Sequence, residues 1–241
     1  MSGKLIGVGT GPGDPELLTL KAVRAIAAAD VVAYFAKAGN ASNARAIVAE
    51  HIMPGQVEEA LDYPVTTEID RRHADYKAAT NAFYAAAAER VAAHLDAGRT
   101  VAVLSEGDPL FYGSYMHLHV RLAHRYDTEV IPGITAMSGC WSSAGLPLVQ
   151  GDDVLSVLPG TLDEVELSRR LIEADAAVIM KVGRNLPKIR RAIEEAGKLE
   201  DAVYVERGTM ANGHSIKLID KEDDIAPYFA LVLVPGWSSR P

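Results

Sequence analysis

The residues of this chain best suited to contact a ligand lie in a glycine-rich stretch near its start. Glycine stands at every second position from Gly7 to Gly13, and Asp-Pro-Glu follows at 14–16. The apolar run 5–8 before the glycines is either a buried strand or a stub of helix. Because glycine has no Cβ, such a loop lets the backbone approach a ligand or another strand closely. The stretch predicts a ligand loop, or a tight turn without a ligand, between a strand and a helix.

The spacing of these glycines excludes two common nucleotide loops. The dinucleotide fingerprint Gly-x-Gly-x-x-Gly would need a glycine at Pro12 or at Asp14, and no Gly-Lys-Ser/Thr ending of a phosphate loop follows Gly13. Asp14 is instead suited to cap the next helix, with Pro15 at its first position. Since Asp14 and Glu16 would repel a phosphate unless they point away, we expect a ligand that is not a phosphate.

A second acidic turn with the same Gly-Asp-Pro sequence lies in the middle of the chain. Residues 106–113 read Glu-Gly-Asp-Pro-Leu-Phe-Tyr-Gly and follow the apolar run 100–104. A further turn, Pro-Gly-Ile-Thr-Ala at 132–136, follows the apolar run 129–131. Ligands of open α/β sheets bind outside the carboxyl ends of the strands. We therefore expect the two Gly-Asp-Pro loops to converge on one crevice.

The elements that must position these turns alternate between strands and helices. In the first half, apolar spacing predicts strands at 31–35, 57–61, 100–104 and 129–131 and helices at 17–29, 42–52, 74–97 and 114–126, with a loop at 63–72. Strand, helix and strand within the first 35 residues form a βαβ unit, so the first two strands should be parallel.

The second half repeats the alternation with a different pattern. Strands are predicted at 154–158, 176–180, 202–206 and 228–234, a looser strand pair at 210–220, and helices from a capping box at Thr161 to Ala174 and over 185–196. The sequence predicts an α/β fold of two α/β domains. Residues 1–134 would hold a parallel sheet with the glycine-rich loop, and residues 135–241 a mixed sheet.

Composition limits the possible functions. The chain has 241 residues, a net charge of −8 and 23% charged residues, which is typical of a globular protein and argues against a nucleic-acid or membrane-surface partner. Its single cysteine, Cys140, excludes an internal disulfide and is expected to be buried. His117 and His119 would point to opposite sides of a helix, so we expect no metal site. Without a visible signal peptide or a long apolar run, a cytoplasmic protein is expected.

These three motifs, in this order and at this spacing, resemble those of the tetrapyrrole methylase family, whose members transfer methyl groups from S-adenosylmethionine. The resemblance covers essentially the whole chain. It implies the family fold of a class III methyltransferase, with two α/β domains and a cofactor cleft between them, as a homodimer. It also implies S-adenosyl-L-methionine as cofactor and S-adenosyl-L-homocysteine as product. The implied cofactor-binding residues are Pro12, Gly107, Asp108, Phe111, Tyr112, Thr135, Ala136, Met180, Gly208 and Leu231.

Within the family, the 106–113 motif and the long helix before it look most like the branch that methylates carbon 20 of precorrin-2 to give precorrin-3A in cobalamin biosynthesis. The branch acting on the cobalt-bearing form looks nearly the same. The uroporphyrinogen methylases have Gly-Gly-Asp-Pro where this chain has Glu106 before Gly107. Asp108 is interpreted either as a cofactor contact or as a cap of its own turn, and Asp14 either as a helix cap or as a catalyst. Met180 is either a cofactor contact or a core residue.

A substrate with eight carboxylates would need a local positive rim on this acidic protein. The candidate cations are Lys37, Arg71, Arg72, Lys181, Arg184 and Arg207. Lys181, Arg184 and Arg207 are preferred, and Arg71-Arg72 is also read as a solvated loop. Tyr34, Tyr112 and Trp141 are candidates to frame a macrocycle, although aromatic residues also fill cores.

No single residue has the pattern of a catalytic acid, base or nucleophile, which leaves alternatives open. Methyl transfer by displacement needs positioning rather than an acid–base pair. The chain could instead be a methylase of the same fold for uroporphyrinogen III, another precorrin, ribosomal RNA or a protein. It could also be a module that binds the cofactor or a tetrapyrrole without catalysis.

Overall fold

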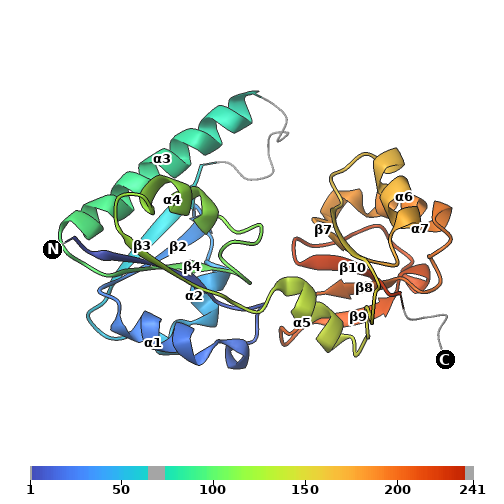
Figure 1. The fold of residues 1–241 in the computed structure, drawn as a ribbon, viewed down its shortest axis with the longest axis horizontal. Coiled ribbons are helices and arrows are strands. Elements are labelled where there is room, and N and C mark those ends of the chain that lie inside the picture. The colour runs from blue at the N-terminus through green and yellow to red at the C-terminus, as the bar shows by residue number, and fades with distance from the viewer. Residues whose placement is uncertain (1, 65–73, 237–241) are drawn as a thin grey trace. The chain divides into compact units, whose positions relative to one another are not determined.

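The computed structural model describes residues 2–64 and 74–236. The chain divides into two compact units, Met1–Thr135 and Ala136–Pro241, which we call unit 1 and unit 2 (Figure 1). The expected boundary lay one residue earlier. Most of the loop expected at 63–72, with Arg71 and Arg72, falls outside the described residues.

Unit 1 is built on a five-stranded parallel sheet. Its strands are β1 (Lys4–Gly9), β2 (Val31–Lys37), β3 (Val57–Tyr63), β4 (Val101–Ser105) and β5 (Asp127–Ile131). They are ordered β3-β2-β4-β1-β5, and every pairing is parallel. The first two strands are parallel as expected but do not touch, because β4 lies between them. Such a sheet is buried on both faces, which explains the apolar runs of β2 and β4.

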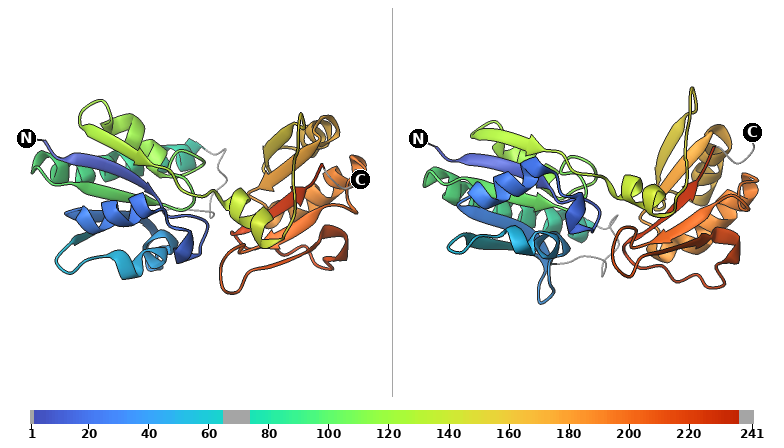
Figure 2. Two further views of the ribbon diagram at one scale, coloured as in Figure 1. Left: turned by 60° about the horizontal axis from the view of Figure 1, so that its bottom comes forward. Right: turned by 90° about the horizontal axis from the view of Figure 1, so that it is seen from below.

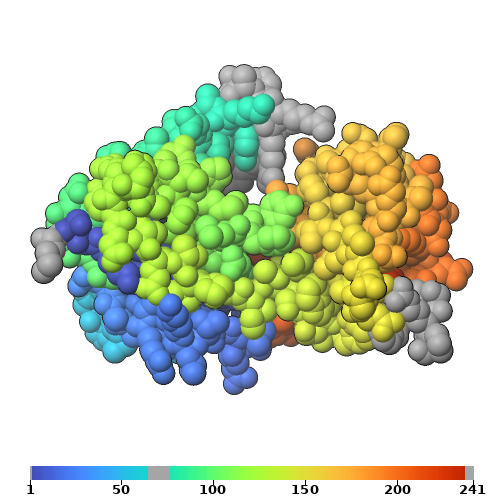
Figure 3. Space-filling view, viewed as in Figure 1, coloured from blue at the N-terminus to red at the C-terminus, as the bar shows by residue number. Residues whose placement is uncertain are grey.

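Helices cover both faces of this sheet. Unit 1 contains the helices α1 (Leu20–Ala28), α2 (Asn43–Ile47), α3 (Ala74–Asp96) and α4 (Tyr115–Leu122) and the 3-10 turns η1 (Pro15–Leu17) and η2 (Ala49–His51). Apolar side chains of α1 and α2 form one buried cluster with the sheet, and those of α3 and α4 form another on the opposite face. The ribbon shows α3 and α4 on the same side of the sheet (Figure 1), and the space-filling view shows the outer surface of the molecule from the same direction (Figure 3).

The first helix begins later than predicted. Asp14 does act as a cap, accepting a hydrogen bond from the Glu16 amide at 2.9 Å, and Pro15 follows at the first position. The capped element is only the three-residue turn η1. The α-helix starts at Leu20, where the Thr19 hydroxyl accepts from the Ala22 amide at 3.1 Å. Two capping residues in succession divide the predicted helix 17–29 into two pieces.

Unit 2 is built on a mixed five-stranded sheet. Its strands are β6 (Leu155–Pro159), β7 (Ala176–Met180), β8 (Val203–Glu206), β9 (His214–Lys217) and β10 (Ala230–Val234). They are ordered β6-β7-β10-β8-β9, and only β6 and β7 pair in parallel. Since β10 runs against both β7 and β8, the carboxyl ends of β7 and β8 lie at the same edge of the sheet.

The helices of unit 2 are α5 (Ala136–Ser143), α6 (Glu164–Glu173) and α7 (Leu186–Glu195), with the 3-10 turns η3 (Gly183–Asn185) and η4 (Leu218–Asp220). Side chains of α6 and α7 form a buried cluster on one face of the sheet. The other face packs against α5 and the segment that follows it (Figure 2).

Three predictions for unit 2 were wrong or incomplete. Helix α5 was not predicted, because its small residues show no apolar periodicity. The α6 cap is Asp163 rather than Thr161, and it accepts from the Glu166 amide at 2.9 Å. The segment 210–220 contains one strand, β9, and the turn η4 instead of a strand pair.

Candidate active site

The carboxyl ends of β1 and β4 mark the point where the connections of the unit 1 sheet diverge. These two strands are neighbours. The chain leaves β1 towards α1 on one face of the sheet and leaves β4 towards α4 on the other (Figure 1). Ligands of open α/β sheets bind at such a switch point. Both Gly-Asp-Pro motifs follow these two strands.

The two Gly-Asp-Pro loops meet as the sequence predicts. The Gly107 amide donates to the Gly11 carbonyl at 2.8 Å, and the Gly11 amide donates to the Gly107 carbonyl at 3.3 Å. Both glycines have positive φ, 75° and 65°, which only glycine adopts without strain. The contact is an isolated antiparallel bridge that joins the two loops just beyond the parallel pairing of β1 and β4.

A third loop, after β5, packs against the same place. A Cβ on Gly9 would lie 2.5 Å from the Gly133 nitrogen and 2.7 Å from the Gly107 carbonyl oxygen. A Cβ on Gly133 would lie 2.1 Å from that same oxygen. The three backbones therefore approach more closely than any side chain would allow, and glycine is required at Gly9 and Gly133.

Asp108 joins two of these loops. Its Oδ1 accepts from the Leu110 amide at 2.9 Å, and its Oδ2 accepts from the Gly133 amide at 3.1 Å. Each carboxylate oxygen therefore already holds one backbone amide. This arrangement matches the reading of Asp108 as a structural residue of its turn, and it places the residue at the edge where a ligand would bind.

The other residues expected at the cofactor in unit 1 lie in the same three loops. Pro12 follows Gly11, and Thr135 ends the loop after β5. The ring of Phe111 contacts that of Tyr112 edge to face at 4.8 Å, and Tyr112 is 46% exposed. Sequence reasoning missed Thr10, which is fully buried and whose hydroxyl donates to the Ser105 carbonyl at 3.2 Å.

In unit 2, Met180 and Leu231 occupy neighbouring strands. Met180 ends β7, and Leu231 lies in β10, next to the residue that pairs with Ile179. Both side chains belong to the apolar cluster that packs against α5, which begins at Ala136. Leu231 is buried and Met180 is half-buried. Three of the four expected unit 2 residues thus belong to this cluster or to the helix that covers it.

Gly208, the fourth, lies directly against α5. A Cβ on Gly208 would lie 2.7 Å from the Cys140 sulfur and 3.0 Å from its Cα. Burial raises the pKa of the Cys140 thiol to about 11, and a hydrogen bond from the Gly208 backbone offsets part of that shift. Cys140 is thus a buried, protonated packing residue, as expected from the sequence.

The preferred cations of unit 2 follow the carboxyl ends of β7 and β8. Lys181 and Arg207 come directly after these strands, and Arg184 lies in η3. Arg207 forms an ion pair with Glu206, which also accepts from the Tyr204 hydroxyl at 2.9 Å. Lys181 and Arg184 are exposed.

Unusual backbone conformations occur at these same positions. Over residues 2–64 and 74–236, four residues other than glycine have positive φ, namely Tyr112, Lys181, Arg207 and Thr209, at 56°, 57°, 48° and 72°. Such conformations cost about 1–3 kcal/mol each and cluster at functional sites. Three of the four, Tyr112, Lys181 and Arg207, are residues that the sequence predicts to bind cofactor or substrate.

Tyr34 lies elsewhere. It is in the middle of β2, and its ring packs with the α1 and α2 face of the sheet. Its hydroxyl hydrogen-bonds to Glu58, whose carboxylate also binds Arg45 at 2.9 and 3.1 Å. Burial, followed by the Glu58 charge, raises the pKa of Tyr34. Lys37 ends the same strand and is exposed, and Trp141 packs within the α5 cluster.

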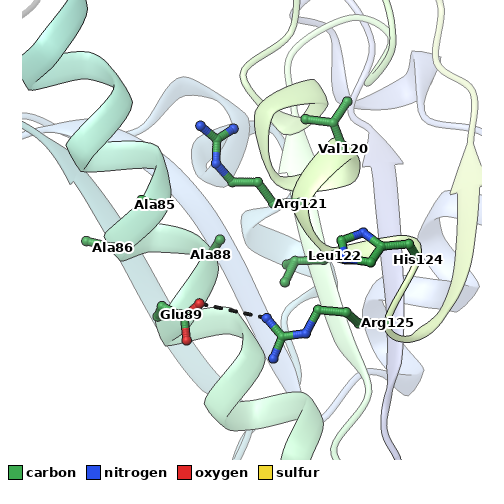
Figure 4. Close-up of a pocket in the computed structure, with 9 residues that line it drawn as sticks. All are labelled: Ala85, Ala86, Ala88, Glu89, Val120, Arg121, Leu122, His124 and Arg125. Carbon is green, nitrogen blue, oxygen red and sulfur yellow. Dashed lines mark ion pairs between the residues drawn. The ribbon is translucent and has the colours of Figure 1, made fainter.

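A surface groove lies between α3 and α4, away from these loops (Figure 4). Alanines of α3 form one wall, and Arg121, His124 and Arg125 line the other, with an ion pair from Arg125 to Glu89 at 3.8 Å. None of the three motifs contributes to it. Across the described residues, no group of three or more possible metal ligands and no membrane-spanning helix is found.

The fold and the loops define a protein with a doubly wound parallel sheet, a second mixed α/β unit and three closely packed loops at the switch point of the parallel sheet. The chain belongs to the Tetrapyrrole (Corrin/Porphyrin) Methylases, whose family model matches residues 4–219.

Two relatives illustrate the range of similarity. The chain is 71% identical over 239 residues to a Sinorhizobium protein named precorrin-2 C(20)-methyltransferase, covering 99% of this chain and 98% of the relative. It is 52% identical over 238 residues to the cobalamin biosynthesis protein CobIJ of Mycobacterium tuberculosis, of which it spans 47%.

Solved structures share the fold. A cobalt precorrin-4 methyltransferase matches with a TM-score of 0.72 and 23% identity, covering 99% of this chain and 96% of that one. A uroporphyrin-III C-methyltransferase from Thermus thermophilus, complexed with S-adenosyl homocysteine, matches with a TM-score of 0.66 and 23% identity, covering 96% of each chain.

Proposed function

We propose that this methylase transfers a methyl group from S-adenosylmethionine to carbon 20 of precorrin-2, giving precorrin-3A, in cobalamin biosynthesis. One observation supports the choice of substrate. The relative at 71% identity over almost its whole length is named for that reaction, whereas the Salmonella typhimurium relative named for the cobalt-bearing substrate is 27% identical.

The reaction requires positioning more than acid–base chemistry. The cofactor supplies a methyl group on a sulfonium, the new carbon–carbon bond forms as the carbon–sulfur bond breaks, and one ring hydrogen leaves as a proton. The chain must align the three atoms and keep water away, which can lower the barrier by up to about 7–11 kcal/mol in the best models. The closely packed backbones of the glycine loops can hold the residues of such a site in position.

We assign to the cofactor the loops of unit 1 that carry Pro12, Gly107, Asp108, Phe111, Tyr112 and Thr135, and the unit 2 residues Ala136, Met180, Gly208 and Leu231. These residues fit an adenosyl cofactor because they combine backbone amides and carbonyls with apolar and aromatic side chains. Asp108 acts by holding the β4 and β5 loops together, since both of its oxygens already bind amides.

We assign to the substrate carboxylates the cations Lys181, Arg184 and Arg207. Their place at the carboxyl ends of β7 and β8 supports the assignment, as does the positive φ of Lys181 and Arg207. On a chain of net charge −8, such a local positive patch is needed to attract a polyanion. Tyr34 is left out because its hydroxyl is held by Glu58 within the sheet.

We further propose that the protein acts in the cytoplasm as a homodimer. Light scattering at micromolar concentration should give twice the chain mass, and a monomer mass would contradict the dimer.

The test of the reaction is anaerobic incubation with methyl-labelled S-adenosylmethionine and precorrin-2, with the label located by carbon NMR. Label at carbon 20 is the expected result. Label only on the cobalt-bearing form, or only on uroporphyrinogen III, would reassign the substrate. Cofactor binding without any turnover would overturn the enzyme assignment.

A further inference from the structure

A cluster of aromatic rings lies at the carboxyl ends of β2 and β3, at the same edge of the unit 1 sheet as the glycine loops. Phe35 comes from the end of β2, Tyr63 from the end of β3, and Phe83 and Tyr84 from α3. The ring centroids of Phe35 and Tyr63 are 5.7 Å apart and nearly parallel, and those of Tyr63 and Phe83 are 4.8 Å apart. None of these residues belongs to the motifs described above.

The hydroxyl of Ser114 holds this cluster in place. Ser114 occupies the capping position of α4 but makes no side-chain cap. Its Oγ instead accepts from the Tyr84 hydroxyl at 3.2 Å and hydrogen-bonds to the Tyr63 hydroxyl. The Tyr84 ring is also stacked on His117, with centroids 3.9 Å apart. Both tyrosine hydroxyls are therefore occupied, so the rings have fixed orientations.

The cluster is not simply part of the core. Tyr84 is buried, but Phe35, Tyr63 and Phe83 are only half-buried, and Phe35 and Phe83 pack against the margin of the buried cluster under α3 and α4. Rings that are held in place but partly open, at the carboxyl edge of a parallel sheet, offer an apolar aromatic surface where ligands of this fold class bind.

A positive charge next to the rings limits the kind of ligand that this surface suits. Lys37 is exposed and pairs in register with Tyr63 across β2 and β3. An apolar aromatic surface beside a cation suits a macrocycle with carboxylates on its rim. That description matches the substrate class of the proposed function, on which this inference rests.

We propose that the half-buried rings of Phe35, Tyr63 and Phe83 form the surface of unit 1 against which the tetrapyrrole ring packs, with Ser114 as the positioning residue that orients Tyr63. In this arrangement the cluster binds substrate and does not contact the cofactor. Loss of a ring should therefore weaken precorrin-2 binding and leave the affinity for S-adenosylhomocysteine unchanged.

The experiment measures equilibrium binding of precorrin-2, under anaerobic conditions and with S-adenosylhomocysteine present, to the wild type and to Tyr63→Leu, Tyr63→Phe and Phe83→Leu. Loss of one ring contact should raise the precorrin-2 Kd about fivefold in Tyr63→Leu and Phe83→Leu. Tyr63→Phe keeps the ring but removes its hydrogen bond to Ser114, so it should raise the Kd about twofold, less than Tyr63→Leu does. The matched control is Tyr126→Leu, whose ring packs near the amino end of β5 and whose hydroxyl donates to Asp96 at 2.8 Å.

The outcomes separate this inference from the proposed function. Equal precorrin-2 affinity in the wild type and Tyr63→Leu overturns the inference even if the wild type methylates carbon 20. Weaker binding of both ligands in Tyr63→Leu indicates a purely structural role and also overturns it. If the wild type methylates uroporphyrinogen III instead, the proposed substrate is wrong. Binding of uroporphyrinogen III to the same variants then tests whether the rings contact the substrate.

Discussion

The Oδ2 atom of Asp108 lies 3.1 Å from the backbone nitrogen of Gly133, so one side chain ties the loop after β4 to the loop after β5. Its other oxygen accepts from the Leu110 amide within its own turn. Two of the three motifs are thus joined by a hydrogen bond between residues 25 positions apart. If water took the place of the Asp108 carboxylate, the two amides would still be hydrogen-bonded, but the loops after β4 and β5 would no longer be tied together.

Substitution of Asp108 should therefore affect both stability and cofactor binding. Asp108→Ala leaves two amides without their carboxylate and should lower the free energy of unfolding by about 2–3 kcal/mol. It should also weaken S-adenosylhomocysteine binding in calorimetry, because the loops lose their link. The control is Asp163→Ala in unit 2, which removes a helix cap and should cost about 1 kcal/mol without changing cofactor affinity. Unchanged affinity in Asp108→Ala would remove Asp108 from the site.

The close approach at Gly9 leads to a second prediction. A methyl group there would lie 2.5 Å from the Gly133 nitrogen, so Gly9→Ala must push two backbones apart. We expect a loss of about 3 kcal/mol in unfolding free energy, at the upper end for overpacking, and a marked loss of cofactor binding.

The control for Gly9 is Gly39→Ala. Gly39 has φ of 81° and no atom within 4 Å of its ideal Cβ, so it reports backbone strain alone, about 1–2 kcal/mol. Chemical denaturation gives the stabilities, and calorimetry gives the affinities. Equal effects of the two substitutions would contradict the close packing of the three loops.

Arg184 is the exposed cation of η3 that we assign to a substrate carboxylate. Arg184→Gln should raise KM for precorrin-2 about fivefold, the effect of losing one charge-assisted hydrogen bond, with little change in kcat. The matched control is Arg191→Gln on α7, an exposed residue whose guanidinium binds Glu164 at 2.7 and 2.9 Å. If both variants keep the wild-type KM, Arg184 does not contact the substrate.

Glu129 provides a prediction about pH. Hydrogen bonds from Lys21 and Lys4, at 2.5 and 2.6 Å, lower its pKa from 4.5 to about 2. A lowered folded-state pKa means that the bridge stabilises the protein above pH 4.5 and that this stabilisation is lost as pH falls towards 2.

Glu129→Gln should therefore be less stable than the wild type at pH 7, and the difference should shrink through that acid window. Because the side chains are partly exposed, 1 M salt should also reduce it. Denaturation curves from pH 7 to pH 2 test this. A difference that does not depend on pH would show that the carboxylate charge is not responsible.

Much of the architecture follows from local sequence signals. The alternation of apolar runs and helical spacing is strong in a buried parallel sheet, and it predicted every strand of unit 1 and four of the five in unit 2. The convergence of the two Gly-Asp-Pro loops was also predictable, because carboxyl ends of parallel strands meet at one edge. Signals that compete locally were less reliable, as with Thr161 and Asp163, which are both good caps only two residues apart.

Residue types and their spacing along the chain were enough to predict the family motifs, the α/β class and the edge of the sheet where the loops meet. Only the tertiary structure showed β4 between β1 and β2, the hydrogen bond from Gly133 to Asp108, the thiol of Cys140 against Gly208, and the Tyr63–Ser114–Tyr84 link. These relationships join residues far apart in the chain, and their energy comes from packing and hydrogen bonds that exist only once the elements are assembled.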